Sequence, residues 1–373
     1  MMRIVRIIIC AISFAVLWGL VIYADESNSA DHPKVQIALL LDTSNSMDGL
    51  INQAKSQLWE IVNDFAKAKQ NGKTPDLEVA LYHYGNSSLS SESNYIEQLT
   101  PFTDNLDLVS EKLFSLKTNG GLEYCGAVIQ RAVQDLKWSD RPDDLRLIFI
   151  AGNVPFTQGP LSYVDACKEA IARYIVINTI HCGDEQTGIA TKWKDGAMLT
   201  DGKYLVINQN EAVVSIAAPQ DKRLAELNSA LNATYIPYGS LGREQQMNQA
   251  AQDSNSGRML ASRVATKASG FYRNSGWDLV DASKDQDFDL AKIEQSELPE
   301  NMQKMTSEEQ KTYIAEQSEQ RKKIQEEIAG LSKERDAFIT AEMKKQGSGN
   351  EQSLGRAMLN SMALLIAFRQ ICA

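Results

Sequence analysis

The sequence predicts an α/β protein with a doubly wound, mostly parallel sheet and a C-terminal helical extension. Two near-continuous apolar runs, "VQIALLLD" (35–42) and "LRLIFIAG" (145–152), are typical of strands that are buried on both faces. Amphipathic helical segments lie between such runs, as the crossover connections of parallel strands require. Strand patterns stop near Pro219, and helical patterns continue beyond it.

The first half of the sheet region alternates strands and helices. Residues 50–72 place apolar side chains at steps of three and four, and the dipeptide "NG" ends the pattern, which predicts a helix. Residues 77–85 form the next predicted strand. Residues 95–102 alternate in polarity and contain Pro101, which suits an edge strand because proline donates no ladder hydrogen bond. Further helices are predicted over 106–116 and 124–136.

The second half continues this alternation and then becomes helical. After the strand at 145–152 we predict a helix over 162–174 and strands over 175–183 and 202–208. The extension is predicted to contain helices over 221–232 and 242–268, a charged helical segment over 299–346 and a last apolar helix over 357–371.

The charged segment contains a short heptad seam. Ile324, Ile328, Leu331, Arg335 and Phe338 follow the four–three spacing of a coiled coil. We interpret the seam as coiled-coil-like packing within the chain in preference to a dimer zipper, and the oligomeric state is left open.

The chain is acidic, with 373 residues, a net charge of −10 and a sequence pI of about 5.0. An acidic surface repels phosphate backbones, so no nucleic-acid partner is expected.

The N-terminus has the pattern of a secretory signal. Arg3 and Arg6 precede an apolar run over 7–23, and Ala24 is the expected cleavage position. The run is longer than most signal cores, so an uncleaved membrane anchor is the alternative. Both interpretations export everything after Ala24, because the arginines stay on the cytoplasmic side. The expected location is the periplasm, free or tethered to the outer face of the inner membrane.

The cysteines are compatible with an oxidising compartment. Besides Cys10 the chain has Cys125, Cys167, Cys182 and Cys372, and it has no CxxC motif and only three histidines, which disfavours a structural zinc site. The preferred disulfide is Cys167–Cys182, with free buried thiols as the alternative.

Polar residues follow the first predicted strand at a regular spacing. Asp42, Ser44 and Ser46 stand at every second position, directly after the apolar run. Ligands of parallel sheets lie beyond the carboxyl ends of the strands, and hard divalent cations take oxygen ligands. The spacing therefore favours a metal site over a plain polar turn.

These residues carry a resemblance to a known family. Residues 42–46, "DTSNS", fit the D-x-S-x-S motif of von Willebrand factor A (vWA) domains. The resemblance covers roughly residues 35–208 and implies a Rossmann-like doubly wound fold. It also implies a metal-ion-dependent adhesion site that holds Mg²⁺, or Mn²⁺ or Ca²⁺, with an open position for a partner's carboxylate. The stretches "NGGLEYCGAVI" and "IAGNVPFTQG" resemble an exported bacterial group of vWA proteins.

The chain departs from the family pattern at the other two loops. The family supplies a threonine from its second loop, whereas the matching position here falls near Leu122 or Glu123. Ala151 stands where the family has an aspartate after its fourth core strand. We therefore expect Glu123, Thr118 and Asn153 as further metal ligands, and weak metal binding. The alternatives are a helix N-terminal carboxylate for Glu123, an ordinary loop hydroxyl for Thr118 and a turn residue for Asn153.

The resemblance implies a division of the chain and a function. The expected parts are a signal peptide or anchor (1–24), a linker (25–33), a vWA domain (34–218), a helical region packing on it (219–298) and a charged helical tail (299–373). The expected function is non-enzymatic binding of a protein partner through the partner's acidic residue. One alternative is a structural envelope protein with a decayed metal site. The other is a phosphatase of the haloacid dehalogenase type, in which Ser44 would replace the second aspartate of D-x-D, the general acid.

Overall fold

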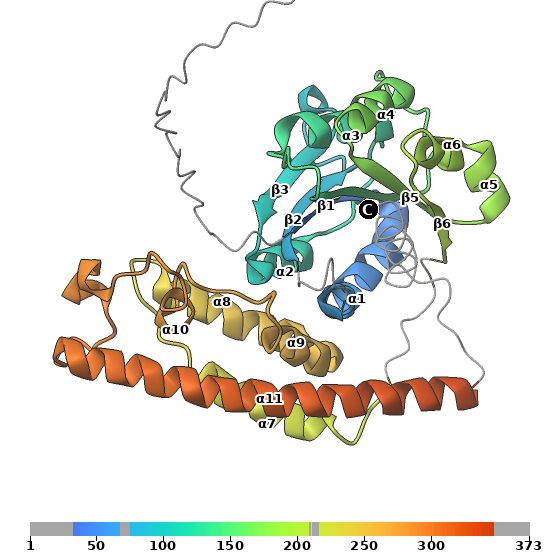
Figure 1. Ribbon diagram of the computed structural model, residues 1–373. Helices are drawn as coiled ribbons and strands as arrows, with labels where there is room; N and C mark the ends of the chain where they lie inside the picture. The colour runs from blue at the N-terminus through green and yellow to red at the C-terminus, as the bar shows by residue number, and fades with distance from the viewer. Residues whose placement is uncertain (1–32, 68–74, 209, 211–215, 347–373) are drawn as a thin grey trace, which may run out of the picture. The chain divides into compact units, whose positions relative to one another are not determined.

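The computed structural model describes residues 33–67, 75–208, 210 and 216–346 (Figure 1). The expected signal or anchor, all but the last residue of the linker, Cys372 and the apolar helix over 357–371 lie outside the described residues. Within the described ranges, no helix combines the length and the apolar composition that a membrane span needs.

The centre of the fold is a six-stranded sheet with the strand order β3-β2-β1-β4-β5-β6. All neighbouring strands are parallel except β2 and β3, so the segment with Pro101 forms an antiparallel edge strand, as predicted. The predicted fold class is confirmed. The strands are β1 (Lys34–Asp42), β2 (Asp76–Tyr84), β3 (Ile96–Thr103), β4 (Leu145–Gly152), β5 (Val176–Cys182) and β6 (Tyr204–Ile207).

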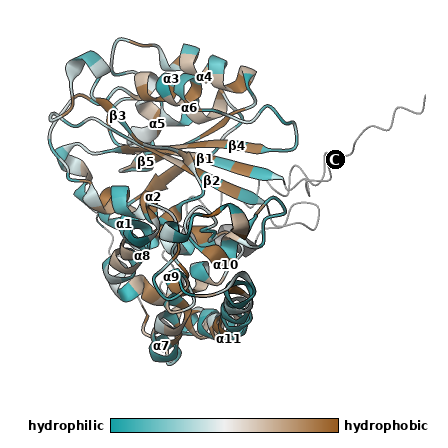
Figure 2. Cartoon of the chain, turned by 90° about the vertical axis from the view of Figure 1, so that its left-hand side faces the viewer, coloured by the Kyte–Doolittle hydropathy of each residue, from teal (hydrophilic) through white to brown (hydrophobic). Residues whose placement is uncertain are grey.

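Helices cover both faces of the sheet, and Figure 2 shows its apolar strands between these layers. Successive side chains of β4 point to opposite faces of the sheet: Phe149 packs with α1 and α2, and Ile150 packs with α3 and α4. Both faces are buried, which is why the strands are almost wholly apolar. The helices are α1 (Asp48–Lys67), α2 (Leu106–Ser115), α3 (Cys125–Asp135), α4 (Tyr163–Ala172), α5 (Glu185–Ala190) and α6 (Trp193–Met198).

The described extension, residues 218–346, is helical, and we call it the helical layer. Its helices are α7 (Asp221–Asn232), α8 (Gly242–Asn255), α9 (Leu260–Lys267), α10 (Leu279–Ala282) and α11 (Ser307–Gln346). The single helix predicted over 242–268 is wrong, because Gly257 adopts a φ of +47° and separates α8 from α9. Glycine tolerates this left-handed conformation, which ends a right-handed helix.

The helical layer shares a hydrophobic core with one face of the sheet domain. Leu231 of α7, Val264 of α9 and Ile328 of α11 belong to the same buried cluster as Leu50 and Leu58 of α1. The aromatic segment between α9 and α10 contributes Phe271, Tyr272 and Trp277 to this cluster.

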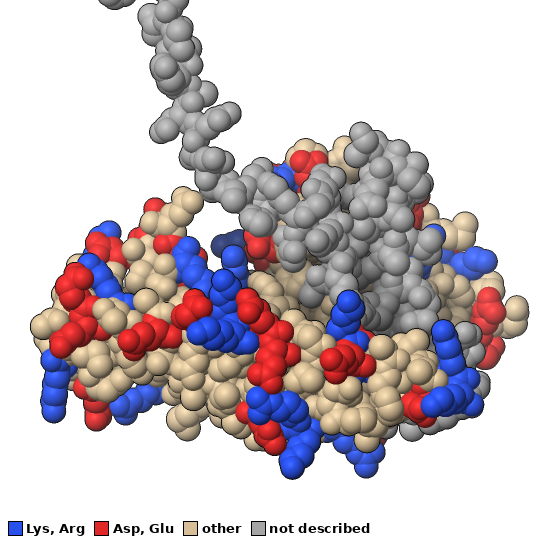
Figure 3. Space-filling model, turned by 60° about the horizontal axis from the view of Figure 1, so that its bottom comes forward, with Lys and Arg blue, Asp and Glu red and all other residues tan. Residues whose placement is uncertain are grey.

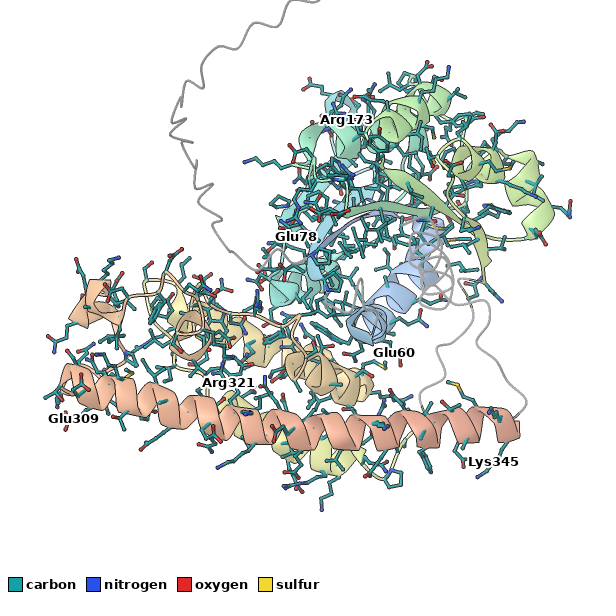
Figure 4. The ribbon with its side chains drawn as sticks, viewed as in Figure 1. Glu60, Glu78, Arg173, Glu309, Arg321 and Lys345 are labelled. Carbon is teal, nitrogen blue, oxygen red and sulfur yellow. The ribbon has the colours of Figure 1, made fainter. Side chains whose placement is uncertain are left out.

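The heptad seam of α11 is used inside the chain. Ile324, Ile328 and Leu331 pack on the shared core. Arg321, on the side of α11 that faces α10 (Figure 4), is buried and pairs with Asp278 at 2.6 Å. Mixed basic and acidic side chains cover the surface of the helical layer seen in Figure 3.

Candidate functional site

The candidate site lies where β1 ends, between the ends of β2 and β4. Asp42 is the last residue of β1, and its Oδ1 accepts a hydrogen bond of 2.8 Å from the backbone N–H of Ser44. This bond closes the turn that leads through residues 45–47 into α1. Asn119 N–H donates to the carbonyl of Thr43 at 2.9 Å, so the loop before α3 is held against the same turn.

Two glycines leave room for the Asp42 carboxylate. A Cβ atom at Gly152, the last residue of β4, would lie 3.0 Å from Asp42 Oδ2. A Cβ atom at Gly85, just after β2, would lie 3.0 Å from Asp42 Oδ1 and 2.4 Å from Glu123 Cγ. Gly85 also has a φ of +76°, which favours glycine. The neighbouring strand ends therefore allow Glu123 to approach Asp42.

The Asp42 carboxylate is buried, and only one of its two oxygens accepts a hydrogen bond from the described residues. It has no solvent exposure, and its Oδ2 has no hydrogen-bond partner among the described residues. Burial and, to a smaller extent, the nearby Glu123 carboxylate raise the pKa of Asp42 to about 7, against the opposing backbone N–H groups of Ser44 and Asn153. A buried charge without a partner is costly, so this oxygen fits a site for a cation.

Glu123 is the second carboxylate of the site. It lies just before α3, is 8% exposed, and has its pKa raised by burial, an effect that a hydrogen bond from the Ser44 side chain opposes. The Ser44 hydroxyl is also within hydrogen-bonding reach of Asp42. Both carboxylates therefore lie close to the hydroxyl of Ser44.

Ser46 and Asn153 form the exposed side of the site. The hydroxyls of Ser44 and Ser46 lie 3.3 Å apart, and Asn153 Nδ2 donates to Ser46 Oγ at 3.1 Å. Asn153 therefore lies next to Ser46, and its amide nitrogen rather than its oxygen faces the Ser46 hydroxyl. In this arrangement it holds Ser46 in place, and its role as a metal ligand stays a prediction.

The structure does not bring Thr118 to the carboxylates. Its hydroxyl donates a hydrogen bond to Asp48, the first residue of α1. Thr118 thus ties the loop before α3 to the start of α1, and its role as a ligand stays a prediction. Within the described ranges, no cluster of three or more His, Cys, Asp and Glu side chains is placed to bind a metal. The candidate site has two carboxylates and completes its oxygen set with serine hydroxyls.

The doubly wound, mostly parallel sheet and the position of the D-x-S-x-S motif at the end of β1 match what the sequence resemblance implied. The sheet domain has the von Willebrand factor A fold.

Comparisons with known proteins give structural neighbours only. No family model matches the sequence, and no curated protein matches it. The structure is similar to the SpRpn10 VWA domain, with 18% identity, a TM-score of 0.36 and coverage of 47% of this chain and 87% of that one. It is also similar to the conserved hypothetical protein BatB from Bacteroides thetaiotaomicron, with 15% identity, a TM-score of 0.35 and coverage of 46% and 90%. An aerotolerance-related membrane protein from Bacteroides fragilis matches with 17% identity, a TM-score of 0.31 and coverage of 47% and 93%.

The position of the missing aspartate needs correction. Ala151 pairs in register with Leu41, and both side chains lie in the core that α1 covers. Because side chains alternate along a strand, the next residues, Asp42 and Gly152, point the other way. Gly152, whose Cβ would approach Asp42 Oδ2, is therefore the position that lacks the aspartate. A carboxylate at Ala151 would enter an apolar core.

The predicted Cys167–Cys182 disulfide is wrong for this structure, in which Cys125, Cys167 and Cys182 are all free and buried. Cys182 packs on the α1 side of the sheet and Cys167 on the α4 side. The sheet itself separates the two sulfur atoms. Cys167 Sγ instead lies 3.5 Å from the carbonyl of Gly196.

Three residues that support the turn after β1 were not predicted. The Thr43 hydroxyl lies 3.0 Å from His83 Nδ1, and His83 Nε2 lies 2.9 Å from Glu97 Oε2. Asn86 Nδ2 donates to the Thr43 carbonyl at 3.3 Å. These contacts exist because β1 and β2 pair with Asp42 opposite Tyr84. No local motif around His83, Asn86 or Glu97 indicates this role.

Proposed function

We propose that the chain is an exported, non-enzymatic protein-binding module that uses a divalent cation at Asp42. The observation that supports this proposal is the buried Asp42 Oδ2, which has no hydrogen-bond partner among the described residues and lies beside the Glu123 carboxylate. Asp42, Ser44, Ser46 and Glu123 would hold Mg²⁺, Mn²⁺ or Ca²⁺, which prefer such oxygen ligands. When bound, the cation supplies an electrophilic position for a carboxylate of the partner.

The count of charged ligands predicts weak metal binding by the free protein. β4 ends at Gly152, and residues 153–158 after it contain no carboxylate, so Asp42 and Glu123 supply the negative charges of the proposed ligand set. Metal affinity rises with the number of charged ligands. An acidic residue of the partner would add a third charge, so metal and partner should each strengthen the binding of the other.

Replacing Glu123 by glutamine is expected to weaken Mg²⁺ or Mn²⁺ binding. The change removes one of the two charges while keeping the shape of the side chain, and we expect a loss of about tenfold or more in affinity. Isothermal titration calorimetry on purified protein measures it. The control is Glu92→Gln, which removes an exposed carboxylate from the connection between β2 and β3. An unchanged affinity in Glu123→Gln would show that the proposed ligand set is wrong.

The proposal as a whole is tested by partner capture from envelope extracts. The wild-type protein should retain a partner with Mg²⁺ present and release it with a chelator, and Asp42→Ala should capture nothing in either condition. If capture is unaffected by the chelator and by Asp42→Ala, the result would favour the interpretation as a structural envelope protein with a decayed metal site. Hydrolysis of a phosphate ester by wild type and not by Asp42→Ala would favour the phosphatase interpretation.

Export is the part of the proposal that rests on the sequence alone. Arg3, Arg6 and the following apolar run support it. A reporter that is active only in the periplasm, fused after Asp48, is expected to give signal, and a reporter active only in the cytoplasm is expected to be silent. The reverse pattern would contradict export, and N-terminal sequencing of the mature protein would decide between a cleaved signal and an anchor.

A further inference from the structure

A lysine amine is enclosed in the core of the helical layer. Lys267, the last residue of α9, has no solvent exposure. Its Nζ donates 2.8 Å to Asn228 Oδ1, donates to Asn232 Oδ1, and lies 3.1 Å from Asp253 Oδ2. Both asparagines belong to α7, and Asp253 belongs to α8. A nucleophilic amine is thus held against two side-chain amides, away from water.

One carboxylate bridges the amine and both amide nitrogens. Asp253 Oδ2 accepts hydrogen bonds of 2.9 Å from Asn228 Nδ2 and 2.7 Å from Asn232 Nδ2, besides its contact with Lys267 Nζ. Its other oxygen accepts a bond of 2.5 Å from Arg263 Nε, which fixes the carboxylate. Asp253 therefore contacts both the Lys267 amine and the amide nitrogens of Asn228 and Asn232. It can accept a proton from the amine and donate a proton to an amide nitrogen.

The charges of the cluster suit proton transfer from the amine. Burial lowers the pKa of Lys267 to about 8, against the opposing effect of Asp253, so a fraction of the amine is neutral near neutral pH. Burial opposes ionisation of Asp253, but Lys267 and Arg263 outweigh it and lower the pKa of this carboxyl below 3.8. Asp253 is therefore ionised at neutral pH, and its oxygens lie where they can accept a proton from the amine.

We propose that Lys267 and Asn232 form an intramolecular amide bond that crosslinks α9 to α7. Asp253 takes a proton from the Lys267 ammonium, and the free amine attacks Cγ of Asn232. The Nζ–Cγ bond forms, Asp253 passes the proton to Nδ2, and the Cγ–Nδ2 bond breaks to release ammonia. Asp253 then takes the second proton from Nζ, which becomes the amide N–H, and passes it to the ammonia, which leaves as ammonium. No oxidant, reductant or other reactant is needed.

Asn232 is the reacting amide and Asn228 positions the amine. Asn232 is the last residue of α7 and is partly exposed, so ammonia has a path to solvent, whereas Asn228 is 6% exposed. The crosslink joins residues 35 positions apart and closes the part of the helical layer that contains α8. It is independent of the cation site and of the proposed function.

Mass spectrometry of the purified full chain tests the crosslink. After tryptic digestion we expect a branched peptide composed of residues 224–243 and 264–273, lighter than the sum of its two arms by one ammonia. Trypsin should not cut after Lys267, because an acylated lysine is not a substrate. A fully unmodified mass, with cleavage after Lys267, in folded protein kept at pH 8 would overturn the proposal.

Variants assign the reacting pair. Asn232→Ala and Lys267→Arg are expected to give two separate peptides, whereas the control Lys284→Arg, an exposed lysine paired with Asp281, should keep the branched one. A branched peptide in Asn232→Ala would also overturn the assignment. If a variant fails to fold by circular dichroism, the wild-type peptide map still decides whether the bond exists.

Discussion

The Asp42→Asn variant is expected to be more stable than the wild type in the absence of metal at pH 8, and to lose all response to Mg²⁺. The wild-type carboxylate is fully buried, has one oxygen without a hydrogen-bond partner among the described residues, and lies beside Glu123. An amide of the same shape removes the buried charge and with it the attraction for a cation. A residue that lowers stability while it creates a binding position is characteristic of functional sites.

The sign and size of this effect follow from the pKa of Asp42. The unfolded carboxyl ionises near 3.8 and the folded one near 7, so between these values the folded state binds the extra proton. The stability associated with Asp42 is therefore fully present below about pH 4 and is lost as the pH rises to about 7. Three pKa units correspond to about 4 kcal/mol at most. The asparagine nitrogen lacks a partner and costs about 1–3 kcal/mol, so the net gain at pH 8 should be about 1–3 kcal/mol.

Urea unfolding at pH 5 and pH 8, with a chelator or with Mg²⁺, measures this prediction. The gain should be larger at pH 8 than at pH 5, and Mg²⁺ should shift the midpoint of the wild type alone. Asp140→Asn, at an exposed aspartate, is the control and should change neither value. A destabilised Asp42→Asn at pH 8, or one that still responds to Mg²⁺, would contradict this account of the site.

Replacing Arg263 by alanine is expected to lower the free energy of unfolding by about 3–5 kcal/mol, the typical cost of breaking a buried ion pair from one side. Arg263 of α9 is fully buried and pairs with Asp107 of α2 at 2.7 Å and Asp253 of α8 at 2.5 Å. Its guanidinium also lies 4.6 Å from the centre of the Trp59 ring of α1. The change would leave Asp107 buried without its cation, at the junction of the vWA domain and the helical layer.

Two further variants show whether geometry or charge alone is responsible. Arg263→Lys keeps the charge but loses the planar fork, so an intermediate loss is expected. Arg223→Ala removes an exposed pair with Glu327, 2.8 Å long, and should leave the urea midpoint close to that of the wild type. A near-wild-type urea midpoint for Arg263→Ala would mean that apolar contacts alone hold the helical layer on the vWA domain.

The sequence by itself determined the fold class and the start of the site. Apolar runs that lack alternation can only be buried on both faces, and the helical segments between them force parallel pairing, which is what β1, β4 and β5 show. The D-x-S-x-S motif is local, since its turn closes through a bond from Ser44 to Asp42. Both features depend on neighbours along the chain, so they can be predicted without knowing how distant segments meet.

Only the tertiary structure decided which distant side chains share the site. Glu123 reaches Asp42 because Gly85 leaves space between them, and Thr118 turns to Asp48 instead. The face of the sheet on which the Ala151 side chain lies depends on the register of β4 with β1, in which Ala151 pairs with Leu41.

The sequence pattern also could not predict which face of the sheet each cysteine lies on or how the helical layer packs. Cys167 and Cys182 are separated because alternate elements cover opposite faces of the sheet. The contacts of Lys267 with α7 and α8 join residues that are up to 39 positions apart. Local periodicity fixes which residues are buried, but partners far apart in the chain are chosen by register, by the handedness of the crossovers and by the packing of whole helices.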